Sequence, residues 1–94
     1  MDNNIQWINR YSNTDKPDKP DHLGRWERTC YCNGLNIANV KMVMERNWVF
    51  YSSKTFFPCS ADEVPYYSTT HESFKEAQEW VEYQWSKFKM IIWG

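Results

Sequence analysis

Glycine and cysteine are scarce in this chain of 94 residues, which contains three of each. So few glycines argue against a glycine-rich loop that cradles phosphates. An odd number of cysteines cannot form a complete set of disulfides within one chain, and we expect free thiols that pack as small hydrophobic groups. Scarcity of these two residues therefore disfavours a phosphate-binding loop and excludes a fully disulfide-bonded scaffold.

An excess of one charge is also missing. Eleven Lys and Arg residues face twelve Asp and Glu residues, for a net charge of −1, and neither sign forms a long run. A protein that binds duplex DNA needs a basic footprint to displace counterions from the phosphates. A protein that mimics DNA needs a large acidic excess. The charge balance disfavours both classes.

Long hydrophobic runs are absent as well. The longest apolar stretch is Met90-Ile91-Ile92-Trp93, far shorter than the roughly 20 residues of a transmembrane helix. Met1-Asp2-Asn3-Asn4 has neither the basic nor the apolar region of a secretory signal. We therefore expect a soluble cytoplasmic protein with no membrane contact.

Aromatic residues are abundant, with six Trp, six Tyr and five Phe. A chain of this length is expected to form one domain, because domains cluster at roughly 100–150 residues. Each aromatic ring must bury a large area to be sheltered. One small core cannot enclose all of these rings, so we expect part of them at the surface.

The first 22 residues differ in composition from the rest. The tripeptide Asp-Lys-Pro occurs twice, at residues 15–17 and 18–20, and each proline favours extended backbone before it. Residues 5–11 form a mixed apolar patch that fits either a short strand or a helical turn. We predict an extended or partly ordered segment over residues 1–22 and a single β-β-β-α domain over residues 23–94.

Three consecutive strands are predicted in the domain. Residues 26–32 favour a strand, and Asn33-Gly34 is a strong hairpin signal because both positions of a type I′ turn need positive φ. Residues 38–45 alternate between apolar and polar, and residues 48–53 follow the tight turn Arg46-Asn47. Trp48 and Phe50 are expected to face the core, with Val49 and Tyr51 pointing away. Tyr66-Tyr67-Ser68 would add a short edge strand.

A helix is predicted over residues 73–89. Ser73 and Glu76 fit a capping box, and Lys87 and Lys89 would lie in the last turn, where they complement the helix dipole. One apolar stripe consists of Phe74, Ala77, Val81, Trp85 and Phe88. The predicted fold class is α+β, a three- to four-stranded antiparallel meander packed on one C-terminal amphipathic helix.

Catalytic and metal chemistry find little support. A zinc site would use Cys30, Cys32, Cys59 and His71 (or His22), but C-x-C is not the usual ligand spacing and no second close pair follows. A nucleophilic pair of Cys59 and His71 would have no evident orienting group or oxyanion pocket. We predict no enzyme activity, no metal and no cofactor.

The aromatic surplus suggests a binding surface, since Trp, Tyr and Arg are enriched among the residues that dominate protein interfaces. The favoured function is a small non-enzymatic protein that binds a heterologous protein partner. The predicted interface residues are Tyr31, Tyr51, Tyr66, Tyr67, Trp80, Tyr83, Arg25, Arg28 and Arg46.

Two alternatives are open. Aromatic rings can stack on the bases of single-stranded nucleic acid, and Arg25, Arg28, Arg46, Lys41 and Lys54 fall on or beside the meander. This mode is less favoured because it also needs a basic groove. The second alternative is a self-assembling structural subunit, including a homodimer.

The order of several motifs resembles a layout that is common among small proteins of tailed bacteriophages. These proteins consist of a β-meander followed by one helix. The motifs are Trp26, Asn33-Gly34, Ala38-x-Val40, Trp48-x-Phe50, Ser73-Phe74-x-Glu76-Ala77 and Trp80-Val81. The resemblance covers residues 23–88 and includes no catalytic motif. It implies an inhibitor that occludes a host defence or regulatory protein, of the anti-CRISPR or anti-restriction type, in the host cytoplasm.

Overall fold

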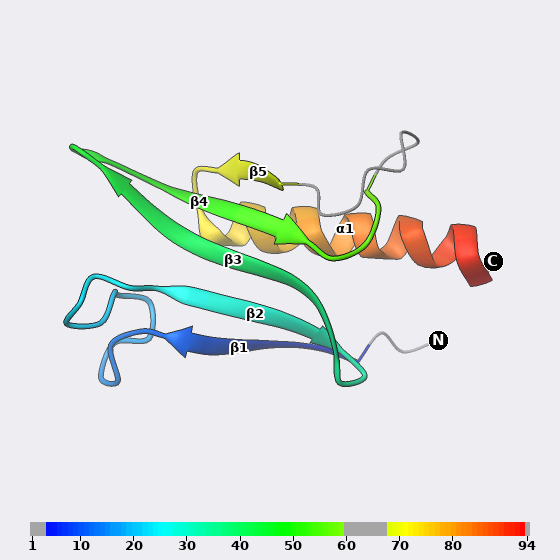
Figure 1. Ribbon diagram of the computed structural model, residues 1–94, viewed down its shortest axis with the longest axis horizontal. Helices are drawn as coiled ribbons and strands as arrows, with labels where there is room; N and C mark the ends of the chain where they lie inside the picture. The colour runs from blue at the N-terminus through cyan, green and yellow to red at the C-terminus, as the bar shows by residue number, and fades with distance from the viewer. Residues whose placement is uncertain (1–3, 60–67, 94) are drawn as a thin grey trace.

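The computed structural model of the protein describes residues 4–59 and 68–93, with the side chains of residues 68 and 91–93 left aside. The elements in chain order are β1 (Ile5–Tyr11), β2 (Glu27–Cys32), β3 (Leu35–Glu45), β4 (Trp48–Thr55), β5 (Ser68–His71) and α1 (Phe74–Trp93). The strands form one sheet in the order β1-β2-β3-β4-β5, and every neighbouring pair is antiparallel. The chain is therefore a five-stranded meander with one C-terminal helix against the sheet (Figure 1).

The α+β class and the antiparallel meander with its helix are confirmed, but the predicted three to four strands were too few. The mixed patch at residues 5–11 is a full strand, β1, which pairs with β2 along the sheet edge. The sheet thus begins inside the segment that we separated from the domain. A second edge strand, β5, covers Ser68–His71, whereas Tyr66 and Tyr67 lie outside the described residues.

The predicted turns are present. Asn33 and Gly34 both have positive φ, 52° and 84°, which the type I′ turn between β2 and β3 requires. Arg46, in the turn between β3 and β4, has a φ of 56°. A bulge on β3 leaves Ile37 without a paired residue on β2, between the pairs Tyr31–Asn36 and Cys30–Ala38. Since a bulge reorients side chains, Ile37 and Ala38 can both be buried although they are adjacent.

The core lies between α1 and one face of the sheet. Ala77, Val81 and Trp85 of α1 are buried, with Phe74 and Phe88 packed beside them, which confirms the predicted stripe. On the sheet side, Cys30, Cys32, Ile37, Ala38 and Phe57 form one group with Val81 and Trp85. Trp26 and Val40 form the other group with Ala77.

The predicted orientation of β4 was wrong. Ser53 and Thr55 are fully buried on the α1 side, whereas Trp48 is 56% exposed. The register explains this: Ser53 pairs with Val40 and Tyr51 pairs with Met42. Since directly opposite residues share a face, the core position of Val40 places Ser53 and Tyr51 on the α1 side and Trp48 and Phe50 on the other.

The helix starts where predicted and ends later. The backbone N–H of Glu76 donates to Ser73 Oγ at 3.2 Å, which confirms Ser73 as the N-cap. Because residues 73–93 contain neither Gly nor Pro, nothing stops the helix at residue 89, and it continues to Trp93. Lys87 and Lys89 therefore lie before the last turn, which contains no basic residue.

Replacing Ser73 by Ala removes the acceptor for the Glu76 amide. We expect the free energy of unfolding to fall by about 1 kcal/mol, the usual cost of losing an N-cap. Urea unfolding followed by circular dichroism measures the change. The replacement Ser73→Asp keeps a capping oxygen and should preserve stability, and an alanine variant as stable as the wild type would show that the cap contributes nothing.

Candidate interaction surface

β3 and β4 are longer than the strands that flank them. The β2 ladder reaches only Lys41 of β3, extended by one bond from the Met42 N–H to the Trp26 carbonyl oxygen at 3.1 Å. The β5 ladder reaches only Tyr51 of β4. Residues 43–50, which we call the arm, therefore project as a two-stranded hairpin beyond both neighbours (Figure 1).

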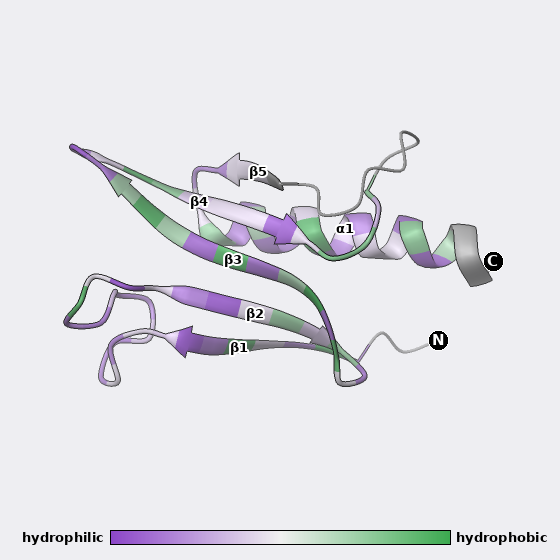
Figure 2. Ribbon diagram, in the orientation of Figure 1, coloured by the Kyte–Doolittle hydropathy of each residue, from purple (hydrophilic) through white to green (hydrophobic). Residues whose placement is uncertain are grey.

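The arm carries apolar side chains on both of its faces. Met44 and Val49 are opposite each other on one face and are 54% and 42% exposed. On the other face, the rings of Trp48 and Phe50 lie with centroids 4.5 Å apart at 35°. Figure 2 shows the hydrophobic stretch of β3 just before the tip, where the hairpin leaves the body of the protein. An exposed apolar cluster on a projecting element is typical of an interaction site.

Polar residues occupy the tip. Arg46 and Asn47 form the turn, and a shallow hollow there is lined by Glu45, Arg46, Asn47 and Trp48. Among the predicted interface residues, Arg46 is thus the one that lies on the arm.

The sheet face opposite α1, which we call the open face, is covered by no helix or other sheet from the part of the chain that the structure describes. Its exposed charged residues include Lys41 and Lys54. Glu27 is also on this face but is buried, where it accepts a hydrogen bond from Asn39 Nδ2 and lies 3.7 Å from Arg10 Nη1. The open face continues without interruption into the Trp48 side of the arm.

Two of the predicted interface aromatics pack against the core. The Tyr51 ring meets the Trp26 ring edge-on at 5.4 Å. The half-buried Trp80 lies beside the core group of Val81 and contacts the His71 ring at 5.5 Å. Both side chains are therefore placed to contribute to folding.

Arg28 is also a packing residue. Its guanidinium lies 4.8 Å from the Trp26 ring centre and 4.5 Å from that of Phe74, and its side chain is only 16% exposed. Its Nε donates a hydrogen bond to Asn9 Oδ1, and its Nη2 forms an ion pair with Asp18 Oδ1 at 2.9 Å. The planar guanidinium of arginine can stack on aromatic rings, and the compact ammonium group of lysine cannot replace it in this role. Arg28 thus ties the segment with the Asp-Lys-Pro repeats to the body of the protein.

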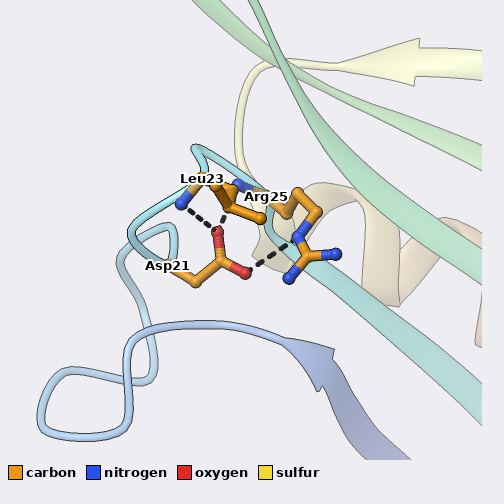
Figure 3. Close-up of polar contacts among 3 residues, drawn as sticks. All are labelled: Asp21, Leu23 and Arg25. Carbon is orange, nitrogen blue, oxygen red and sulfur yellow. Dashed lines mark hydrogen bonds and ion pairs between the residues drawn. The ribbon is translucent and has the colours of Figure 1, made fainter.

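Arg25 is held in a turn. Asp21 Oδ1 accepts hydrogen bonds from the backbone N–H groups of Leu23 and Arg25, at 2.9 and 2.8 Å. Asp21 Oδ2 accepts a hydrogen bond from Arg25 Nε at 2.9 Å (Figure 3). The Arg25 guanidinium lies 4.2 Å above the Tyr11 ring. Gly24 allows the turn with its positive φ of 78°. The backbone N–H of Arg25, above all, lowers the pKa of the Asp21 carboxyl.

The Asp21 turn predicts a pH dependence. A carboxyl whose pKa is lower in the folded state stabilises the protein above its unfolded pKa of about 4, and this contribution is lost as pH falls through the folded pKa. Asp21→Asn should therefore lower the melting temperature at pH 7. The difference from wild type should shrink in acid, as both chains become neutral at this position. Equal melting temperatures at pH 7 would contradict the role of the carboxylate.

The remaining predicted residues are dispersed. Tyr31 is half-buried on the open face, opposite Gln6 and Asn36. Tyr83 is 60% exposed on α1, with Lys87 Nζ 5.3 Å from its ring centre. Tyr66 and Tyr67 lie outside the described residues. The predicted interface residues that the structure describes do not gather on one surface.

The residues considered for catalysis contact other groups. Cys59 Sγ lies 3.0 Å from Thr55 Oγ1, and His71 Nε2 lies 3.0 Å from Ser53 Oγ. Ser53 has no exposed surface, so the Ser–His contact is closed to a substrate. Burial raises the pKa of the Cys59 thiol and lowers that of His71. A thiol with a raised pKa is a poor nucleophile.

All three cysteines are free thiols, and Cys30 and Cys32 pack in the core as small hydrophobic groups, as predicted. Over residues 4–59 and 68–93, no group of three or more His, Cys, Asp or Glu side chains is placed to hold a metal ion. In the same ranges, no helix has the length and hydropathy needed to span a bilayer.

The arm was missed at the sequence level because Trp48 and Phe50 were assigned to the core. A usable signal was present. The alternating pattern from Ala38 to Glu45 is longer than the one that ends at Cys32, and unequal strands in a meander must leave an overhang.

Comparison of the chain with family models, with curated proteins and with solved structures found no match. The arm and the open face are therefore interpreted from their own geometry.

Proposed function

We propose that the protein is a small non-enzymatic binding protein that docks on a heterologous protein through the arm. The observation that carries this proposal is the exposure of Met44, Trp48 and Val49 on a hairpin that extends beyond both neighbouring strands. A single hairpin is only marginally stable in water. Its exposed apolar side chains are not buried in the free protein and so add little to its stability. They gain burial when a partner covers them.

The arm has the composition of an interface centre. A tryptophan at its exposed end, an arginine at the tip and a phenylalanine behind them belong to the types that are enriched at protein interfaces. The inhibitor hypothesis, in which a phage-encoded protein occludes a host defence or regulatory protein, fits this arrangement, because occlusion requires only a projecting contact surface. No reactive group is needed for such a role.

Quantitative affinity capture tests the proposal. Immobilised wild type, Trp48→Ala and Tyr83→Ala would be incubated in parallel with lysate of the cell in which the protein is made. Tyr83→Ala is the matched control, since it removes an aromatic ring of similar exposure from α1. We expect a protein that is retained by wild type and Tyr83→Ala and lost with Trp48→Ala. Equal retention by all three would contradict the proposal.

A second candidate is single-stranded nucleic acid. The observation in its favour is that Trp48 and Phe50 share the open face with Lys41 and Lys54, which combines stacking rings with basic groups. This mode predicts that oligothymidylate quenches tryptophan fluorescence and that the affinity falls steeply with salt. Absence of quenching at low salt would eliminate it.

A further inference from the structure

β1 forms one edge of the sheet (Figure 1). Its inner side pairs with β2, and no strand from the described part of the chain pairs with its outer side. Such an edge presents a row of unpaired N–H and C=O groups, which proteins commonly protect with lysine, proline or a bulge. β1 contains neither lysine nor proline, its one charged residue is Arg10, and its bulge lies between Asn9 and Tyr11. Residues 5–9 are therefore a regular edge without this protection.

The direction of bonding alternates from residue to residue along a strand. Cys32 closes the two-residue turn after β2 and so bonds toward β3. Three residues earlier on the same strand, Thr29 bonds toward β1, where it is opposite Ile8. Ile8 therefore bonds inward to β2. Its neighbours Trp7 and Asn9 direct their backbone N–H and C=O groups outward, away from the sheet.

Ile8 is the exposed apolar side chain of this edge. It is the middle residue of β1 and is 49% exposed. The preceding Trp7 lies on the α1 side, where its Nε1 donates to Glu82 Oε2 at 2.9 Å. Since successive side chains of a strand point to opposite faces, Ile8 lies on the open face. A strand added to the outer side of β1 would cover it.

We propose that the outer edge of β1 pairs with β1 of a second copy of the chain, antiparallel and with the two-fold axis at Ile8. Through such an axis both copies use the same surface. Ile8 lies opposite Ile8 of the second copy at a non-hydrogen-bonded position, where side chains approach most closely. The outward backbone groups of Trp7 and Asn9 bond those of Asn9 and Trp7 of the second copy. The two sheets become one continuous sheet.

The residues of β1 favour this self-pairing and its register. With the axis at Ile8, the two exposed isoleucines cover each other, and Arg10 is at the level of the uncharged Gln6 of the second copy. The one charge of the strand thus does not meet its like. An axis one residue away, at Trp7 or Asn9, would place Ile8 opposite Gln6 or Arg10 instead. A strand of this sequence therefore matches a second copy of itself best about its middle residue.

The proposed dimer leaves the arm free and goes beyond the binding role of the arm. β3 runs in the same direction as β1, and the arm extends past the level of Tyr11 at the end of β1. Antiparallel pairing reverses this direction in the second copy, so the two arms lie at opposite ends of the shared sheet. Two arms on one dimer would bind a repeated partner more tightly than one arm does.

Sedimentation velocity between about 10 μM and about 1 mM tests the pairing, because one short edge is smaller than a standard interface and predicts weak association. The weight-average mass of the wild type should rise toward twice that of the monomer. Ile8→Lys should stay monomeric, since two like charges would be opposed at the axis. Met44→Lys is the matched control, because Met44 is 54% exposed on the arm, and it should associate as the wild type does.

Disulfide cross-linking tests the register and does not depend on the folding of Ile8→Lys. Under mild oxidation, Ile8→Cys should form a covalent dimer that a reductant dissolves, since Cα atoms of a non-hydrogen-bonded pair lie about 4.5 Å apart. In Gln6→Cys, the two new thiols would be four residues apart along the strands, about 14 Å, which is too far for a disulfide. This variant and the wild type, with its three native free thiols, should not cross-link.

Three results would overturn the inference. The first is a wild type that stays monomeric at about 1 mM, and the second is Ile8→Lys that associates as strongly as the wild type. The third is equal cross-linking of Ile8→Cys and Gln6→Cys, which contradicts the antiparallel register. Association that is lost in Met44→Lys and kept in Ile8→Lys would place the contact on the arm. The capture experiment with Trp48→Ala tests the arm separately, so failure of the β1 pairing and failure of the proposed function are distinguishable.

Discussion

Replacing Trp26 by alanine should lower the free energy of unfolding by about 3–5 kcal/mol, the usual cost of truncating a buried aromatic ring. Trp26 is 3% exposed and meets the rings of Tyr51 and Phe74, both at 5.4 Å. Its Nε1 donates to the Pro17 carbonyl oxygen at 2.9 Å. Because domains are stable by only about 5–15 kcal/mol, this one change removes a large part of the total.

Equilibrium unfolding in urea measures this loss, and Trp26→Phe serves as the companion variant if the alanine chain does not fold. Phenylalanine keeps most of the ring packing and deletes the bond to Pro17, so its cost should be smaller, about 0.5–1.5 kcal/mol for the hydrogen bond plus the lost ring volume. An alanine variant that loses less than the phenylalanine variant would contradict the structural role of Trp26.

Trp48→Ala should have the opposite profile. Since its side chain is 56% exposed and projects on the arm, its removal should change the melting temperature by little. Partner affinity should fall by about 30-fold or more, because central interface tryptophans contribute about 2 kcal/mol or more. Calorimetric titration of the captured partner measures this loss. The same measurement on Tyr51→Ala separates the two roles, since Tyr51 packs on Trp26 and should affect stability first.

The helix and the turns followed from local sequence. Ser73 with Glu76, the apolar spacing from Phe74 to Phe88 and the Asn33-Gly34 pair are signals whose physics acts within a few residues. The end of the helix did not follow, because the two lysines indicated a favourable last turn but nothing in the chain stops the helix there. Charge near a helix end contributes too little to decide where it ends.

The candidate site was not predictable in the same way. The faces of β4 depend on its register with β3, where the core position of Val40 decides the orientation of Ser53. At the start of β4, Trp48 and Phe50 on one face are about as apolar as Val49 and Tyr51 on the other. The sequence of this strand alone therefore does not show which face is buried. Arg28 was predicted as an interface residue, whereas two aromatic rings and Asp18 surround its guanidinium and compensate its burial. Such compensation depends on residues far apart in the sequence.

The arm resulted from a mismatch of lengths. β3 has 11 residues and β2 has 6, so the hairpin extends past its neighbour whatever its composition. Composition then decides what the overhang does. Edge regions of sheets are commonly protected by charge or proline, and the arm instead carries Met44, Trp48 and Val49.

The central claim is that the arm binds a protein while the rest of the chain holds it in place. The most direct measurement is the paired determination of partner affinity and melting temperature for Trp48→Ala and Tyr83→Ala. We predict that Trp48→Ala loses about 30-fold or more in affinity at an unchanged melting temperature, and that Tyr83→Ala changes neither. Wild-type affinity in Trp48→Ala, or an equal loss in both variants, would contradict the account.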